Sequence, residues 1–155
     1  MSSSLRPYRY WEEDGKYVFL APSGARYVAY FLDLSYLAAN LFTFNFDKER
    51  DGTEASPDDR VFDTVCSILG AFFSNHRNSM LVVCDSSDGR AEARSRLFNS
   101  WFRSIAPEGL SKIDRNGRTD AYDFYLSGFL WDDNPDKENL ISILDDYLTA
   151  AMLTS

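Results

Sequence analysis

A short polar segment between an apolar run and a helical pattern carries residue types that could bind an anion. It joins the apolar run Met80–Cys84 to a helical pattern that begins near Asp88. Ligands in α/β arrangements bind beyond the carboxyl ends of strands, and the first turn of a helix offers unpaired N–H groups to an anion. Two hydroxyls and a glycine, which permits close backbone approach, add to these donors. The candidate ligand-binding residues are Asp85, Ser86, Ser87, Asp88, Gly89, Arg90 and Arg94.

Arg90 and Arg94 extend the apolar stripe of this predicted helix. They lie four residues apart and therefore share a helix face, and the same spacing continues to Phe98 and then Trp101. A guanidinium in line with an apolar stripe needs a counter-charge, because an unpaired buried charge is costly. That counter-charge is either an internal carboxylate such as Asp85 or the phosphate or carboxylate group of a ligand. The sequence leaves both alternatives open, and the first would make the arginines structural.

Other catalytic or metal-binding chemistry has little support in the sequence. His76 is the single histidine and follows a predicted helix in a polar segment, as a surface histidine would. Cys66 and Cys84 lie in apolar segments, which is typical of buried free thiols. Asp85 and Asp88 have no third acid placed near them for a magnesium site. We therefore expect no metal, no cofactor and no catalytic constellation.

The composition indicates one globular domain and argues against several classes of partner. The chain has 155 residues, of which 45% are hydrophobic, and this suffices for a core. No apolar run approaches the roughly 20 residues of a membrane-spanning helix, and the N-terminus lacks the apolar core of a secretion signal. The net charge of −8 argues against broad nucleic-acid binding. We expect a cytoplasmic protein that binds neither membranes nor nucleic acid.

Charge is spread unevenly along the chain. Residues 88–118 hold seven Lys or Arg against four Asp or Glu, whereas residues 119–155 hold eight acids and one lysine. The acidic C-terminal part is a solvated face, a docking surface for a basic partner or a mimic of nucleic acid.

The spacing of apolar residues and turn signals predicts the elements of the fold. The predicted strands span residues 16–21, 26–34, 41–46, 79–84, 110–116 and 119–131, with the last two joined by a turn at Asn116-Gly117. The predicted helices run from a cap at Ser56 to about Asn75, from near Asp88 to Pro107, and from Asn134 onward. Residues 1–14 form a lead-in segment and residues 47–56 an exposed acidic loop.

The order β-β-β-α-β-α-β-β-α predicts an α+β fold in a single domain over residues 1–155. Three strands in succession favour antiparallel pairing, and the α-β-α middle permits one parallel neighbour. We therefore expect a mixed, mostly antiparallel sheet with three helices.

The chain resembles a family of small uncharacterised bacterial proteins, a domain of unknown function. The resemblance rests on two patterns. The first is DxxxxDTxxxIxxxFF from Asp58 to Phe73, and the second is the CDSSDGR run from Cys84 to Arg90, followed by Arg94, Leu97-Phe98 and Trp101-Phe102. It implies no activity. The order of elements is also similar to the core of the GCN5-related N-acetyltransferase fold. There the acyl-CoA pyrophosphate meets a glycine-rich loop; the corresponding segment here, Phe46–Asp58, has Gly52 but lacks the RxxGxG-like pattern.

Aromatic residues crowd the first third of the chain. Most are expected in the core or in cross-strand pairs, and an exposed remainder would form a protein-binding patch. They are Tyr8, Tyr10, Trp11, Tyr17, Tyr27, Tyr30, Phe31, Tyr36, Phe42, Phe44 and Phe46. Our leading interpretation is a non-catalytic interaction domain with a protein partner or a second copy of itself. The alternative is a protein that binds acyl-CoA or another phosphate-containing ligand, or a degenerate N-acetyltransferase-like enzyme.

Overall fold

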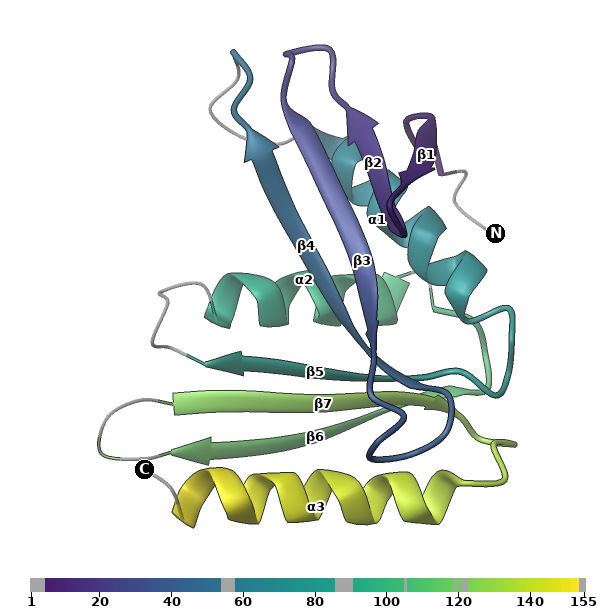
Figure 1. The fold of residues 1–155 in the computed structure, drawn as a ribbon, viewed down its shortest axis with the longest axis vertical. Helices are drawn as coiled ribbons and strands as arrows, with labels where there is room; N and C mark the ends of the chain where they lie inside the picture. The colour runs from purple at the N-terminus through teal and green to yellow at the C-terminus, as the bar shows by residue number, and fades with distance from the viewer. Residues whose placement is uncertain are drawn as a thin grey trace. The chain divides into compact units, whose positions relative to one another are not determined.

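The computed structural model describes residues 5–53, 58–85, 91–104, 106–118, 120 and 123–153. In these ranges three helices accompany a mixed seven-stranded sheet, which confirms the predicted α+β class (Figure 1). The elements are β1 (Tyr10–Glu13), β2 (Lys16–Leu20), β3 (Arg26–Asp33), β4 (Leu41–Arg50), α1 (Asp59–Phe72), β5 (Ser79–Asp85), α2 (Ala91–Ser104), β6 (Leu110–Arg118), β7 (Asp123–Trp131) and α3 (Lys137–Leu153).

The strand order in the sheet is β1-β2-β3-β4-β5-β7-β6. β5 pairs in parallel with β4, where Leu41 lies opposite Ser79, and antiparallel with β7. The pairs β1–β2, β2–β3 and β6–β7 are antiparallel. The sheet is therefore mixed and mostly antiparallel, as predicted.

Internal contacts divide the chain into two compact units. The first comprises Met1–Leu32 and Phe44–Ser74, and the second comprises Asp33–Thr43 and Asn75–Ser155. Strands β3 and β4 each contribute residues to both units, so neither unit is one continuous segment. A single domain over residues 1–155 stays a prediction.

In the first unit, α1 packs against one face of the antiparallel strands. Helix α1 begins where the Asp58 carboxylate accepts a hydrogen bond from the Val61 N–H at 3.1 Å. Near its last turn, the Phe72 ring stacks on Phe31 of β3 at 4.2 Å between centroids. The predicted cap was wrong, because Asp58 has the extended backbone and the reach that an N-cap requires. Ser56 itself lies outside the described residues. The helix also ends at Phe72 rather than near Asn75.

A row of stacked rings forms the core of this unit. Phe19 is fully buried and lies between the rings of Tyr8, Tyr27 and Phe46, at 6.4, 5.1 and 6.2 Å between centroids. The Tyr8 N–H donates to the Thr64 hydroxyl at 2.8 Å, which holds the N-terminal segment on α1.

The lead-in segment contains a strand that the sequence analysis missed. β1 pairs with β2 from Tyr10–Phe19 to Glu13–Lys16. The connecting residues Asp14 and Gly15 both have positive φ, 52° and 78°, as a two-residue type I′ hairpin requires.

The expected acidic loop begins later than predicted, because β4 continues to Arg50. The last residues of β4 bond to β3 and to the turn that precedes β3. Glu49 accepts from the Arg26 Nε at 3.1 Å, and the Arg50 Nε donates to the Gly24 carbonyl at 3.1 Å. Residues 47–50 thus belong to β4, and these side-chain bonds tie its end to the neighbouring residues; the side chains are exposed as expected.

In the second unit, α2 and α3 lie on opposite faces of β5, β7 and β6. Successive residues of a strand face opposite ways, so Phe129 of β7 meets α2 while Leu130 meets α3. Phe98, Trp101 and Phe102 of α2 contact Phe129. Leu140 and Leu144 of α3 pack with a buried leucine cluster: Leu41, Leu81, Leu126 and Leu130. The buried stripe predicted for α2 is thus confirmed at Phe98 and Trp101.

The predicted turn at Asn116-Gly117 was wrong. Both residues lie within β6, where Gly117 is opposite Phe124 and Arg118 is opposite Asp123. A turn at 116–117 would place Arg115 opposite Arg118, and like charges directly opposite destabilise a sheet. The observed register instead gives an Arg118–Asp123 ion pair at 2.9 Å.

Candidate functional site

The predicted anion-binding segment lies largely outside the described residues. β5 ends at Asp85 and α2 begins at Ala91, so a strand, a short connection and a helix follow one another as expected. Ser86, Ser87, Asp88, Gly89 and Arg90 lie in that connection, beyond the described part of the chain, as do the side chains of Asp85 and Arg94. Position 94 precedes the buried Phe98 by one helical turn. The segment stays a prediction.

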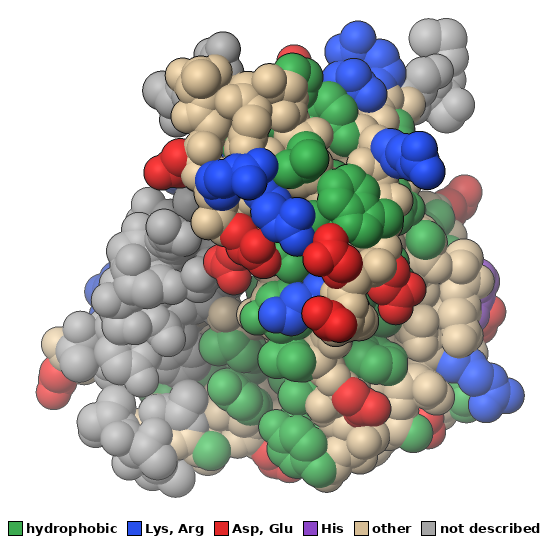
Figure 2. Space-filling view, turned by 45° about the horizontal axis from the view of Figure 1, so that its top comes forward, with side chains coloured by type: hydrophobic (Ala, Val, Ile, Leu, Met, Phe, Trp, Pro, Cys, Tyr) green, Lys and Arg blue, Asp and Glu red, His purple; other side chains and the backbone are tan. Residues whose placement is uncertain are grey.

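The large exposed hydrophobic residues of the first unit share one face of its sheet. Within the described residues of this unit they are Trp11, Leu20 and Leu32, which are 37%, 42% and 50% exposed. Trp11 lies opposite Val18, and Val18 lies opposite Val28. Strand alternation from these pairs places Trp11, Leu20 and Leu32 on the face that points away from α1. We call this sheet face the Trp11 face; it carries Trp11, Glu13, Lys16, Val18, Leu20, Arg26, Val28, Tyr30 and Leu32, of which Val18 and Val28 are buried. Figure 2 shows hydrophobic side chains at the molecular surface between groups of both charges.

Three charged side chains pair with one another at the Trp11 face, while the Lys16 ammonium lies over the Tyr30 ring at 4.6 Å from its centroid. Arg26 forms ion pairs with Glu49 at 3.1 Å and with Glu13 at 3.3 Å. The hydrogen bond to Glu49, and to a smaller extent the one to Glu13, raises the pKa of Arg26. The Trp11 indole N–H donates to Glu13 at 2.6 Å, and this bond, together with Arg26, lowers the pKa of Glu13. The hydrogen bond also orients the indole, so its apolar surface is presented in a fixed position.

A second surface feature is a hollow between α2 and β6, lined by Asn99, Phe102, Arg103, Lys112 and Asp114. We call it the α2–β6 hollow; its volume is about 410 Å³. The Lys112 ammonium lies 2.5 Å from the Asp114 carboxylate, and the Ser127 hydroxyl donates to the same oxygen at 2.6 Å. Burial alone would raise the pKa of Asp114, but bonds from Lys112 and Ser127 and the nearby positive charge lower it. Asp114 is therefore ionised at neutral pH.

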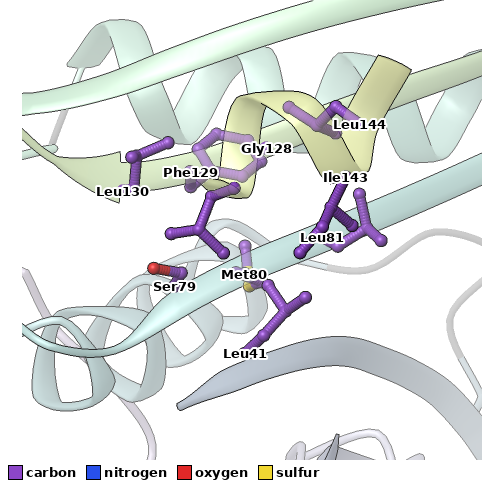
Figure 3. A pocket seen from close by; sticks show the side chains of 10 residues that line it. Leu41, Ser79, Met80, Leu81, Gly128, Phe129, Leu130, Ile143 and Leu144 are labelled. Atoms are coloured by element: carbon purple, nitrogen blue, oxygen red, sulfur yellow. The ribbon is translucent and has the colours of Figure 1, made fainter. Parts of the chain in front are cut away.

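A small cavity in the second unit belongs to the core (Figure 3). Its walls come from β4, β5, β7 and α3 and are apolar except at Ser79. The Ser79 hydroxyl already accepts a hydrogen bond from the Asn134 side chain at 3.0 Å. The cavity volume is about 10 Å³, roughly the space of one water molecule, so it is a packing gap.

Two residues that could act in nucleophilic catalysis have structural surroundings. The His76 ring stacks on Trp131 at 3.7 Å, and its Nδ1 lies 3.1 Å from Asp133 at the exposed surface. Cys66 is buried in α1, and burial followed by the charge of Asp63 raises the pKa of its thiol to about 12. The Cys66 thiol is therefore almost entirely protonated at neutral pH and is no nucleophile. Within the described ranges, no three His, Cys, Asp or Glu residues form a group that could hold a metal ion.

Comparison with known proteins places the chain in a family. Residues 57–148 match a family of unknown function, DUF6169. The chain belongs to this family. The match covers the predicted segment at 85–94 and the α2–β6 hollow, while the Trp11 face precedes the matched DUF6169 residues. The resemblance to a family without assigned activity is thereby confirmed, and the bacterial source stays a prediction.

Curated proteins and solved structures give little further information about this DUF6169 chain. No curated protein matches the chain. Among solved structures, it is similar to a CoA-dependent acyl-homoserine lactone synthase, MesI, with 14% identity and a TM-score of 0.39 over 85% of this chain and 70% of that chain. In the described part of this DUF6169 chain, we find no helix with the length and apolar character needed to span a membrane.

From the sequence, Phe102 was expected only in the apolar face of its helix, and the other residues of the α2–β6 hollow were not singled out. The only signal was the basic bias of residues 88–118, which contain Arg103 and Lys112. For the Trp11 face, sequence reasoning named the aromatic crowding but could not say which rings would be exposed. The structure puts Phe19, Tyr27 and Phe46 in the ring stack and leaves Trp11 at the surface.

Proposed function

We propose that this DUF6169 chain is a non-catalytic protein-binding domain whose docking surface is the Trp11 face. One observation carries the proposal: the exposed large hydrophobic side chains described in the first unit, Trp11, Leu20 and Leu32, all lie on the sheet face that α1 does not cover. Exposed apolar side chains scattered singly need no explanation, but three on one sheet face favour an interaction surface.

The details of the face suit a protein partner. Tryptophan is among the residues that contribute most to protein interfaces, and an indole held by a hydrogen bond loses little freedom on binding. Arg26 and Glu49 already neutralise each other at the edge of the face. A partner therefore needs an apolar surface to meet Trp11, Leu20 and Leu32 rather than a charge to meet Arg26 or Glu49. A different protein and a second copy of this chain both meet this requirement.

The test is a double substitution of the two apolar anchors, Trp11→Ser with Leu20→Ser. Each buried large side chain contributes about 1.5–3 kcal/mol, so the double variant should weaken binding at least about tenfold. Tyr36→Ser is the matched control, because Tyr36 is 80% exposed and does not belong to the Trp11 face. Light scattering of the full chain reports self-association, and quantitative pull-down from native lysate reports other partners.

The expected result is a stoichiometric complex by one of these methods that the double variant loses and the Tyr36 variant keeps. A monomer that recovers no stoichiometric partner would overturn the proposal. So would a complex that the double variant forms as well as the unsubstituted chain does.

A second candidate function is anion binding by the segment from Asp85 to Arg94. The observation that favours it is the helical position of Arg94, one turn before the buried Phe98. Under this candidate, CoA or inorganic phosphate raises the melting temperature, and Arg94→Ala removes the rise while circular dichroism shows a folded chain. An Arg94→Ala variant that does not fold would mean that the arginine is structural, and the candidate would then be abandoned.

A further inference from the structure

The α2–β6 hollow collects hydrogen-bond donors from a helix and a strand. Arg103 of α2 is exposed, and no hydrogen bond or ion pair joins it to another described residue. The Asn99 amide lies one helical turn before it and lines the same hollow. Across the hollow, the Lys112 ammonium has three N–H groups, and its recorded partner among the described residues is Asp114.

Lys112 is held in place more firmly than a surface lysine. It lies opposite Phe129 in the β6–β7 register, and Phe129 is the centre of the aromatic contacts with α2. The Lys112 side chain is 11% exposed, so its stem packs against the sheet while its ammonium reaches the hollow. A charge fixed before binding loses little side-chain entropy when a ligand arrives.

The hollow is positive in a protein that is strongly negative overall. Arg103 and Lys112 contribute two positive charges and Asp114 one negative charge, whereas the whole chain carries −8. Asp114 does not cancel both cations, and its carboxylate is already bonded to Ser127 as well as to Lys112. An anionic group entering the hollow would therefore find a net positive charge and several donors.

We infer that the α2–β6 hollow binds a small ligand through an anionic group, a carboxylate or a phosphate, held between Arg103 and Lys112. The guanidinium of arginine and the ammonium of lysine both bind these oxygens, and arginine can do so through two parallel hydrogen bonds. The ring of Phe102 gives the ligand an apolar wall, and the Asp114 carboxylate can accept a hydrogen bond from a ligand hydroxyl or amine. A volume of about 410 Å³ lies within the usual range for small-molecule sites.

The experiment titrates the full chain with inorganic phosphate and, separately, with acetate at constant ionic strength. Nuclear magnetic resonance follows the backbone amides of α2 and β6. With one or both anions, the amides near Arg103 and Lys112 should shift in a saturable manner. Arg103→Ala should raise the apparent Kd at least tenfold. Arg77→Ala is the matched control, because it removes the same charge from an exposed position of the second unit outside the hollow.

A response to phosphate alone or to acetate alone supports the site and identifies the class of anionic group. The inference is overturned if neither anion shifts these amides, or if Arg103→Ala binds as tightly as the unsubstituted chain. It is also overturned if Arg94→Ala abolishes binding while Arg103→Ala leaves it intact, because the anion would then bind at the segment from Asp85 to Arg94.

Discussion

Replacing Phe19 by alanine is expected to lower the free energy of unfolding by about 3–5 kcal/mol. Phe19 is fully buried at the centre of the ring stack of the first unit, between Tyr8, Tyr27 and Phe46. Removing its ring loses the transfer free energy of the side chain and leaves a cavity. The neighbouring rings come from three different segments and cannot all move inward to fill it. Small domains are stable by roughly 5–15 kcal/mol in total, so the loss is a large fraction.

Chemical denaturation followed by far-ultraviolet circular dichroism measures this loss. Phe19→Leu keeps an apolar side chain in the stack and should be markedly less destabilising than alanine. Tyr36→Ala, at an exposed position, should change the free energy of unfolding by less than about 0.5 kcal/mol. A Phe19→Ala variant that loses less than about 1 kcal/mol would contradict the central place of this ring in the core.

The sequence predicts those parts of the fold in which the spacing of apolar residues along one segment shows which side chains are buried. Phe42, Phe44 and Phe46 alternate with polar residues, and they lie in a strand. Val61, Val65 and Leu69 of α1 repeat at helical spacing and are buried, as are Phe98 and Trp101 of α2. In each case one segment contains the whole signal, because the same residues define the period and contact the core.

Elements whose existence depends on a distant partner were missed or misplaced. β1 has only four residues, three of them exposed, so its sequence shows no strong alternation. β1 is a strand because the turn at Asp14 and Gly15 brings β2 back alongside it. Asn116-Gly117 is a good local turn signal, yet pairing along the whole of β6 and β7 outweighs it.

The candidate sites were hard to predict for the same reason. Arg103 and Lys112 belong to a helix and a strand, and they line one hollow because the β6–β7 register sets Lys112 opposite Phe129, beneath α2. Trp11 faces away from α1 because it pairs with Val18, a matter of register rather than of residue type. A sequence can list aromatic and basic residues, but strand register decides which of them share a surface.

The second large effect is expected from Trp101→Ala, which should lower the free energy of unfolding by about 3–5 kcal/mol. Trp101 is buried in α2, and its ring meets Phe129 edge-on at 5.6 Å. Among the described side chains of α2, Phe98, Trp101 and Phe102 contact the sheet through Phe129 and hold the helix on it. Trp101→Phe retains an aromatic contact and should lose much less, while Ser104→Ala, at an exposed position in the same helix, serves as the control.

The same variant separates the packing of α2 from the chemistry of the α2–β6 hollow. Trp101 does not line the hollow, but the neighbouring Phe102 and Arg103 do. If α2 positions Arg103, Trp101→Ala should weaken phosphate binding together with stability, and Trp101→Phe should largely preserve both. Unchanged stability in Trp101→Ala would contradict the role of this ring in holding α2. Unchanged phosphate affinity despite lost stability would mean that the hollow needs the charge of Arg103 but not a firmly packed helix beneath it.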